Sequence, residues 1–140
     1  MIKALILMEM ESIFYGDGEI SCSKDSYIGR HSSIQAYKGC HVYIGENVSI
    51  SHYVKIYTRN SLADQDFSLK KDCSFKYSKG DVRIENDCWI GTNVFIKENV
   101  KIGKNSVVGA NSVVTRNIPA NAIAGGIPAK VIKMKSQIDN

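Results

Sequence analysis

The sequence lacks the long apolar segments of membrane proteins. The stretch MIKALILM at its start has eight residues, whereas a helix that spans a bilayer needs about 20. Acidic residues follow it at once, and nothing else in the chain suggests export. We therefore expect no membrane span, and we expect residues 1–8 to form a strand or a short helix that caps one end of the fold.

The sequence also lacks paired cysteines. Its four cysteines are Cys22, Cys40, Cys73 and Cys88, and no two of them form a CxxC motif. Zinc sites and redox pairs usually show such spacing. We expect four buried free thiols in a reducing cytoplasm, because unpaired cysteines behave as small apolar residues and disulfides are rare in that compartment.

A concentrated charge of one sign is missing as well. The net charge is +4, and the basic residues are dispersed except for Lys130, Lys133 and Lys135 near the end. A surface that binds nucleic acid would need a broader basic stripe interleaved with aromatic residues. The sequence therefore predicts no nucleic-acid partner and favours an anionic small molecule that docks at the C-terminal end.

A six-residue repeat is the main positive signal. From residue 84 the chain reads IENDCW, IGTNVF, IKENVK, IGKNSV, VGANSV and VTRNIP, so each block begins with an aliphatic residue. A helix would repeat at three and four residues, and an alternating strand at two. A period of six fits a solenoid in which each block is a short strand plus a corner, with its first and fifth residues pointing inward.

Asparagines at the same spacing fit the corners of this solenoid. They are Asn93, Asn99, Asn105, Asn111 and Asn117. A tight corner needs a residue that tolerates positive φ, and asparagine does so at low cost. We interpret these side chains as structural. Three blocks make one coil, so the 140 residues form one domain of about four or five coils.

The repeat is interrupted twice. Blocks also begin at residues 22, 28, 34, 44, 50 and 56, and the step of ten after Ile34 predicts that Lys38, Gly39 and Cys40 bulge from a corner. Between Ile56 and Ile84 the rhythm vanishes altogether. We expect a long extruded loop at about residues 59–81, and insertions of this length in compact folds are usually functional or mobile.

The segment WIGTNVFIKENVKIGKNSVVGANSVVTRNIPANAIAGGIPAKVIK resembles the hexapeptide-repeat acyltransferases, in particular sugar O-acetyltransferases such as galactoside and maltose acetyltransferases. The resemblance implies an all-β fold, a left-handed parallel β-helix of triangular section. It also implies a homotrimer with active sites between subunits, where acetyl-CoA lies in the groove. Spacing alone gives a coil without a hand.

The resemblance also implies which residues contact the coenzyme. Trp89 matches an aromatic residue that lines the active site, and Thr92 a hydroxyl residue near the thioester. The backbone of Ala110 and the residue Thr115 match contacts along the pantetheine arm. Two lysines, Lys130 and Lys133, match cations that face the phosphates of the coenzyme. Lysines of a solvated tail that binds no ligand would give the same sequence pattern. The bare backbone of Gly125 and Gly126 permits close approach of the coenzyme, or else a plain exit from the solenoid in which Pro128 is cis.

The expected catalytic histidine is absent. The family places it shortly after a strand that ends like IYT, but here Asn60 and Ser61 follow Thr58. Neither side chain acts as a base at neutral pH, and general-base help is worth roughly 10² to 10⁴ in rate. His52 is the candidate replacement, with His31 one coil below.

Two further explanations remain open. In the first, the acceptor nucleophile is an amine, which needs less help from a general base. Asp64 or Asp66 then orients its ammonium group before deprotonation. Alternatively, the protein is a trimeric solenoid that binds coenzyme A or a sugar without turning it over. Nucleotide-sugar N-acetyltransferases, of which some manage without the histidine, fit the first explanation but are usually longer.

Other members of the fold fit less well. A γ-class carbonic anhydrase needs three histidine zinc ligands, and no histidine falls in the later coils, so we expect no metal. A serine acetyltransferase would need an additional N-terminal helical domain. The sequence thus predicts a cytoplasmic, acetyl-CoA-dependent enzyme that acetylates a sugar hydroxyl or amine of a cell-surface polysaccharide or a nucleotide-sugar precursor.

Overall fold

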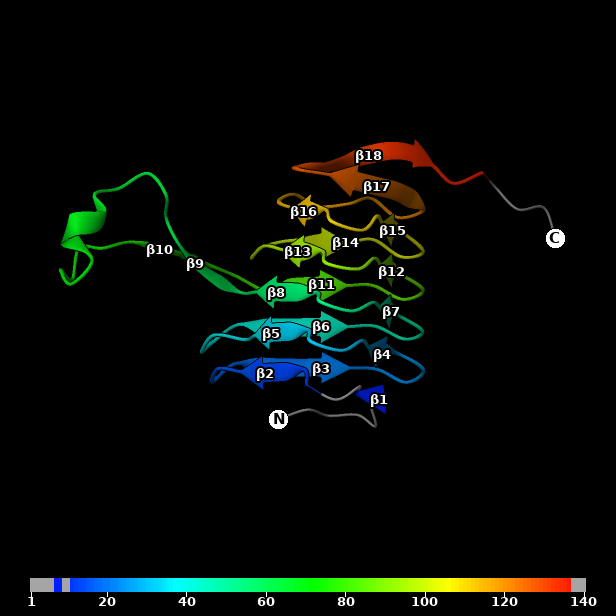
Figure 1. Ribbon diagram of the computed structural model, residues 1–140, viewed down its shortest axis with the longest axis horizontal. Helices are drawn as coiled ribbons and strands as arrows, with labels where there is room; N and C mark the ends of the chain where they lie inside the picture. Colours follow the sequence, from blue (N-terminus) through cyan, green and yellow to red (C-terminus); the bar gives the residue numbers. More distant parts are fainter. Residues whose placement is uncertain (1–6, 9–10, 137–140) are drawn as a thin grey trace.

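The chain winds into a three-sided prism from which one long hairpin projects (Figure 1). The computed structural model describes residues 7–8 and 11–136. Most of the predicted N-terminal cap, residues 1–6, lies outside the described residues. Its last two residues form β1 (Leu7–Met8), which pairs with the next strand of the same face.

Three sheets form the faces of the prism, and we number them in the order in which the chain visits them. Face 1 contains β1, β4 (Tyr27–Ile28), β7 (Ser49–Ile50), β12 (Trp89–Ile90), β15 (Val107–Val108), β17 (Ala122–Gly126) and β18 (Ala129–Met134). Face 2 contains β2 (Ile13–Tyr15), β5 (Ser33–Gln35), β8 (Lys55–Tyr57), β13 (Phe95–Ile96) and β16 (Val113–Val114). Face 3 contains β3 (Glu19–Cys22), β6 (His41–Ile44), β11 (Val82–Ile84) and β14 (Lys101–Ile102).

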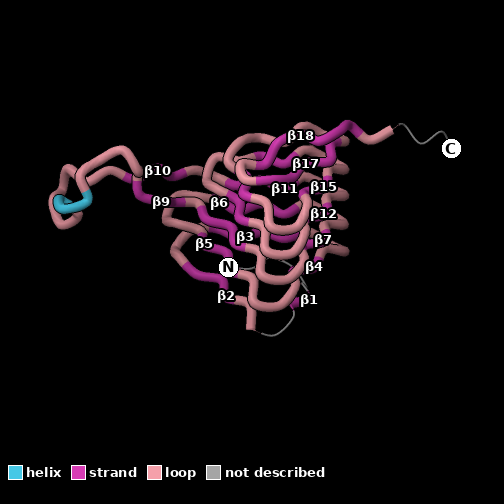
Figure 2. Tube along the Cα trace, turned by 45° about the horizontal axis from the view of Figure 1, so that its top comes forward, coloured by secondary structure: helices cyan, strands magenta, loops and turns pink. Residues whose placement is uncertain are grey.

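Every strand pair of the prism is parallel except β17 with β18, an antiparallel hairpin over the last coil (Figure 2). The strands make five coils, within the predicted range of four or five. Successive coils align identical block positions: Trp89 pairs with Val107 and Phe95 with Val113, each 18 residues on. The chain passes from face 1 to face 2 at a first corner, to face 3 at a second, and back to face 1 at a third.

The core is the column of inward positions that the sequence predicts. The first residues of the six blocks are fully buried: Ile84, Ile90, Ile96, Ile102, Val108 and Val114, all at 0% exposure. The fifth residues are buried as well: Cys88, Val94, Val100, Ser106, Ser112 and Ile118, at 4% or less. A buried hydroxyl needs a partner, and Ser106 finds one by donating to the Pro119 carbonyl at 2.6 Å.

Four of the five predicted asparagine corners are confirmed. Asn93, Asn99, Asn105 and Asn111 have φ between 60° and 64°. The prediction for Asn117 is wrong, because the last coil is two residues shorter: Ile118 bridges to Ile102, 16 residues earlier. The shortened second corner needs no positive φ there, and Asn117 Oδ1 instead accepts the Lys101 backbone N–H at 2.8 Å.

Two cysteine predictions are also wrong. Cys40 does not bulge from the corner. Its N–H closes a turn onto the Tyr37 carbonyl at 2.8 Å, and Gly39, at φ 80°, lets the chain return so that Cys40 is buried. Cys73 is exposed, because it lies on the projecting hairpin and outside the prism, whereas Cys22 and Cys88 are buried as expected.

The predicted loop at 59–81 is an ordered hairpin that leaves the second corner. Its arms are β9 (Arg59–Ser61) and β10 (Tyr77–Lys79), which pair antiparallel, and its tip carries the 3₁₀ helix η1 (Phe67–Leu69). The rings of Phe67 and Tyr77 pack edge-on against buried Phe75, with centroids 5.3 and 5.4 Å away. The hairpin therefore has a small aromatic core of its own.

A cation anchors the hairpin to the prism. The Arg59 guanidinium lies between two rings, 4.3 Å from the centroid of Tyr37 and 3.6 Å from that of Tyr77. Below it, fully buried Thr58 accepts the Tyr37 backbone N–H at 2.7 Å. These contacts give the base of the hairpin one defined direction as it leaves the prism.

Candidate functional site

Some of the predicted site residues gather along the first corner. The Asn93 backbone N–H donates to the carbonyl of His52, and that of Asn111 to the carbonyl of Thr92, both at 2.9 Å. This register stacks His52, Thr92 and Ala110 in successive coils, and all three are exposed. The corner thus presents a column of accessible backbone and short side chains that an extended ligand can follow.

His52 is poorly placed to act as a base. Its Nδ1 accepts the backbone N–H of Arg30 at 2.9 Å. In a neutral imidazole the nitrogen that accepts a hydrogen bond is the one that carries the lone pair, and the other nitrogen carries the proton. The basic nitrogen of His52 is therefore engaged with the scaffold, and proton abstraction would require this hydrogen bond to break.

Trp89 lies on face 1, close to this column. The residue is 55% exposed, and its indole N–H points to the Ser51 hydroxyl at 3.4 Å. An exposed tryptophan leaves a large apolar surface in contact with water, which is unfavourable unless a partner covers it. Its position beside the first corner suits an aromatic wall of a groove.

Of the two glycines at the end of β17, Gly126 has a structural reason to be glycine. Gly126 has a φ of 104°, a backbone conformation that residues with a side chain rarely adopt. Its N–H donates to Ser112 Oγ at 3.1 Å. At Gly125 an added Cβ would lie 3.3 Å from Ile132 Cδ1. The Ile127–Pro128 peptide bond is cis, as the sequence suggests.

The turn after β17 forms a small basic pocket of about 350 Å³. It is lined by Thr115, Arg116, Pro128, Ala129 and Lys130. The structure thus brings two predicted coenzyme residues together, Thr115 and Lys130, and adds Arg116. Sequence reasoning missed Arg116, whose one signal was its place beside Thr115. Lys133 is exposed on β18, opposite Ile123.

The predicted catalytic residues of the loop lie on the hairpin at the second corner. Asn60 and Ser61 belong to β9, and Ser61 is exposed opposite Tyr77. Asp64 is farther out, in a pocket of about 240 Å³ near η1 that Asp66 also lines. Hydrogen bonds from the side chain and backbone of Ser68 lower the pKa of Asp66, which caps η1. Asp66 therefore has a structural role.

Asn60 forms an interaction that the sequence did not reveal. Its Nδ2 donates a hydrogen bond to Oε2 of Glu98, whose side chain has 0% exposure. The other carboxylate oxygen, Oε1, makes no well-directed hydrogen bond and faces Lys97 Nζ at 3.1 Å. Burial, the largest single influence, raises the pKa of Glu98, but hydrogen bonds from Asn60, Ser78, its own backbone and Lys97 together lower the pKa. Glu98 is therefore a buried carboxylate that remains ionised at neutral pH.

The two groups of candidate residues do not meet within one chain. His52, Thr92 and Ala110 follow the first corner, whereas Asn60, Ser61 and Asp64 leave from the second, and face 2 separates the corners. A single site that used both groups would need the first corner of one copy and the hairpin of another.

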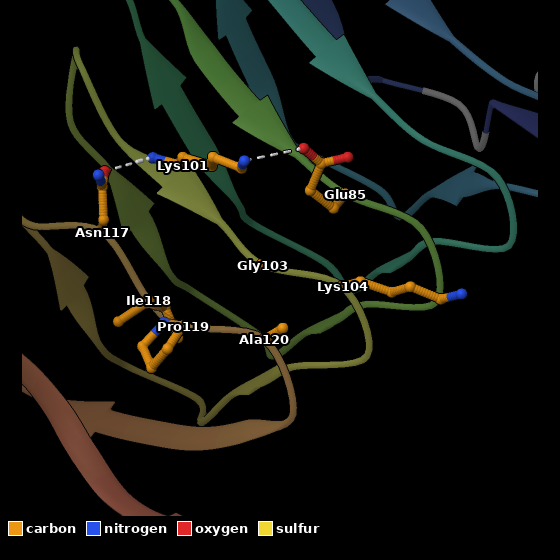
Figure 3. A pocket seen from close by; sticks show the side chains of 8 residues that line it. All are labelled: Glu85, Lys101, Gly103, Lys104, Asn117, Ile118, Pro119 and Ala120. Carbon is orange, nitrogen blue, oxygen red and sulfur yellow. Dashed lines mark hydrogen bonds and ion pairs between the residues drawn. The ribbon is translucent and has the colours of Figure 1, made fainter.

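A third pocket, of about 520 Å³, lies on face 3 (Figure 3). It opens where the shortened last coil brings Ile118, Pro119 and Ala120 beside Lys101. Its charges are matched within the chain, since Lys101 Nζ lies 3.5 Å from Glu85 Oε1. None of the residues of either candidate group lines this pocket.

The described residues contain no cluster of three or more histidine, cysteine, aspartate or glutamate side chains that would hold a metal ion. Nor does the described part of the chain include a helix long and apolar enough to cross a bilayer.

Residues 81–116 match the family model described as bacterial transferase hexapeptide (six repeats). The match covers β11 to β16 and the corners that carry Thr92, Asn93 and Ala110. Over these residues the chain carries the hexapeptide repeat of that family. Among curated proteins, none matches it by sequence.

Solved structures resemble this hexapeptide-repeat protein over nearly its whole length. The maltose O-acetyltransferase of Clostridium difficile 630 is 29% identical, with a TM-score of 0.61, over 89% of this chain and 71% of that one. A hexapeptide-repeat acetyltransferase of Vibrio cholerae O1 biovar eltor, complexed with acetyl coenzyme A, is 27% identical, with a TM-score of 0.58, over 94% and 72%.

A third structure is close in shape but more distant in sequence. It is the N-acyltransferase AntD of Bacillus cereus, in complex with dTDP-4-amino-4,6-dideoxyglucose and coenzyme A. It is 20% identical, with a TM-score of 0.78, over 95% of this chain and 72% of that one. At this identity the likeness concerns the fold, which is the left-handed parallel β-helix predicted from the repeat and the resemblance.

The outward surfaces of this hexapeptide-repeat protein differ in character. Face 2 exposes Ile13 at 62% and Tyr15 at 43%, and above them Tyr57 packs edge-on against Phe95 at 5.3 Å. Face 3 instead carries charged side chains such as Arg83 and Glu85, which pair at 2.7 Å. Exposed apolar side chains occur at interaction sites, so Ile13 and Tyr15 offer face 2 as a surface for contact with another protein.

Proposed function

We propose that this protein is an acetyltransferase that moves the acetyl group of acetyl-CoA to a hydroxyl or amino group of a sugar. The observation that carries this proposal is the exposed column of Thr92 and Ala110 at the first corner, together with the basic pocket of Arg116 and Lys130 at the turn after β17. The maltose O-acetyltransferase and the V. cholerae acetyltransferase, both above 25% identity, support the same chemistry.

The residues present fit acetyl-CoA. Its phosphates need cations, which Arg116 and Lys130 supply at the pocket and Lys133 nearby on β18. Its amide-containing pantetheine arm can follow the backbone past Thr115, Gly126 and Ala110 toward Thr92. Trp89 then lines the end of this path, where the thioester would lie.

We propose that the active unit is a homotrimer with sites between subunits. The separation of Asn60 from Thr92 by face 2 supports this arrangement, because a neighbouring copy would bring a hairpin to a first corner. The exposed apolar residues of face 2, such as Ile13 and Tyr15, supply surface for the contact. Light scattering on the purified protein tests it: a mass of three chains supports the proposal, and a monomer at micromolar concentration would contradict it.

The acceptor that we propose is a sugar or nucleotide-sugar of cell-surface polysaccharide synthesis, in the cytoplasm. The maltose O-acetyltransferase supports a sugar acceptor. A reducing compartment agrees with the four free cysteines.

A second candidate function is binding without turnover. It is favoured by the absence of an available base at the candidate site: Asn60 is an amide, and the basic nitrogen of His52 accepts the Arg30 N–H. This trimeric solenoid would bind coenzyme A or a sugar and release no thiol.

Thiol release from acetyl-CoA, measured over a panel of hydroxy and amino sugars, separates the two functions. Turnover with any sugar supports the transferase. Tight binding of acetyl-CoA by calorimetry, with no thiol release on the whole panel, supports the binding protein. Failure to bind acetyl-CoA would contradict the transferase, and failure to bind any sugar of the panel as well would contradict both functions.

A further inference from the structure

The strongest unexplained feature is the buried carboxylate of Glu98 under the base of the hairpin. It lies one coil above Thr58, and its side chain has no exposed surface. Burying an ionised carboxylate costs free energy unless it is paired and hydrogen-bonded. Asn60 Nδ2 and Lys97 Nζ supply that compensation.

The carboxylate dictates which way the Asn60 amide faces. An ionised carboxylate only accepts hydrogen bonds, whereas an asparagine amide has N–H donors on one side and a carbonyl acceptor on the other. The N–H side must therefore face Glu98, and the carbonyl oxygen Oδ1 must face away from it. Asn60 is partly exposed, and no residue in the described part of the chain donates a hydrogen bond to Oδ1.

We propose that Glu98 is a positioning residue that holds Asn60 so that its carbonyl oxygen meets the acceptor as a hydrogen-bond acceptor, and that the acceptor nucleophile is an amine. This inference rests on the proposed acetyl transfer. A hydroxyl would need a base to remove its proton during attack. An amide oxygen does not take up a proton at neutral pH, but it can orient an N–H group.

The reaction balances without a protein base. The sugar ammonium first gives one proton to water, and an N–H of the resulting amine donates to Asn60 Oδ1. The nitrogen lone pair then attacks the thioester carbonyl, so a C–N bond forms and the C–S bond breaks with its electrons on sulfur. The surplus proton on nitrogen passes to the thiolate, which leaves an amide and the free thiol of coenzyme A.

The first test compares acceptors that differ only in the nucleophile. We expect thiol release with glucosamine or UDP-glucosamine, and at least tenfold less with glucose or UDP-glucose, because general-base help is usually worth at least about 10². Equal rates with hydroxyl acceptors would overturn the inference and leave the acetyltransferase function intact. Absence of acetyl-CoA binding would instead contradict the proposed function itself.

The second test uses Glu98→Gln to reverse the orientation of the Asn60 amide. In this variant the Lys97 ammonium holds the carbonyl oxygen of the side chain at position 98. The N–H side of that amide therefore faces Asn60, and the Asn60 carbonyl turns inward to accept its hydrogen bond. We expect kcat with the amine to fall about tenfold or more, the usual worth of one charge-assisted hydrogen bond, while the Kd for acetyl-CoA stays unchanged. The matched control is Glu85→Gln, which removes an ion-paired carboxylate on face 3 and should leave kcat unchanged.

A swapped pair separates positioning from simple loss of stability. In Asn60→Asp/Glu98→Gln the amide at 98 donates to the carboxylate at 60, which again presents an acceptor oxygen to the amine. We expect this double variant to recover amine transfer relative to Glu98→Gln alone. A folded double variant that transfers no faster, or a Glu98→Gln enzyme with normal kcat, would overturn the inference.

Discussion

Replacing Asn60 by histidine is expected to create the base that the site lacks. The Glu98 carboxylate that now accepts the Asn60 N–H would accept the Nδ1–H of the imidazole. The hydrogen bond then fixes the tautomer with Nε2 as the lone-pair nitrogen facing outward, as carboxylates do for catalytic histidines. Asn60→His should therefore transfer acetyl to hydroxyl acceptors.

The size and pH dependence of the gain follow from the same contact. General-base help is worth roughly 10² to 10⁴ in rate, so hydroxyl transfer should rise by about a hundredfold or more. An adjacent buried carboxylate favours the charged imidazolium and raises the histidine pKa above about 6.5, by about 1 to 3 units. Because only the neutral imidazole is a base, the new activity should increase as pH rises through this elevated pKa.

The assay is thiol release from acetyl-CoA with glucose or UDP-glucose, between about pH 6 and pH 10 so that it brackets the raised pKa. Ser61→His is the matched control, because Ser61 is exposed on the same strand and no carboxylate among residues 7–8 and 11–136 is hydrogen-bonded to it. The reasoning is refuted if folded Asn60→His, with normal acetyl-CoA binding, gains less than tenfold. If the activity of Asn60→His increases with pH around the ordinary histidine pKa instead, the role of Glu98 is refuted.

Three further outcomes are expected. Arg116→Ala combined with Lys130→Ala should weaken acetyl-CoA binding at least about tenfold with an unchanged Tm, since each cation is worth a charge-assisted contact; an unchanged Kd by calorimetry would remove the basic pocket from the site. Ile90→Ala should lower the free energy of unfolding by about 2–5 kcal/mol, because the side chain is fully buried; a loss below about 1 kcal/mol in urea unfolding would contradict the inward ladder. A thiol reagent should label exposed Cys73 first, whereas burial raises the pKa of Cys22 to about 11; mass spectrometry that finds equal labelling of both would contradict this.

The prism could be predicted from the sequence because each of its positions is decided locally. Ile90 and Val94 point inward because the six-residue period places them there, and Asn93 marks a corner because few other residues tolerate its φ of 60°. Asn117 looked the same in sequence. Its environment depends on how many residues the last coil contains, and the period alone does not show that two are missing.

The site was harder to predict because it depends on contacts between distant segments. Glu98 occupies the third position of its block, where Thr92, Lys104 and Ala110 are exposed, so the pattern predicts a solvated charge. The hairpin at 59–81 covers it, and no local rule gives the direction in which that hairpin leaves the prism. Asn60 could be singled out, because the resemblance expects a histidine nearby, but its partner was visible only in the structure.

The most direct test of the central claim is the mass of an amino-sugar acceptor after incubation with acetyl-CoA and the purified protein. We predict that glucosamine or UDP-glucosamine gains one acetyl group, bound to nitrogen and stable to mild alkali, with one thiol released per acetyl transferred. Unchanged acceptor mass over a panel of amino and hydroxy sugars, with acetyl-CoA bound, would contradict the account, and so would an alkali-labile ester as the main product.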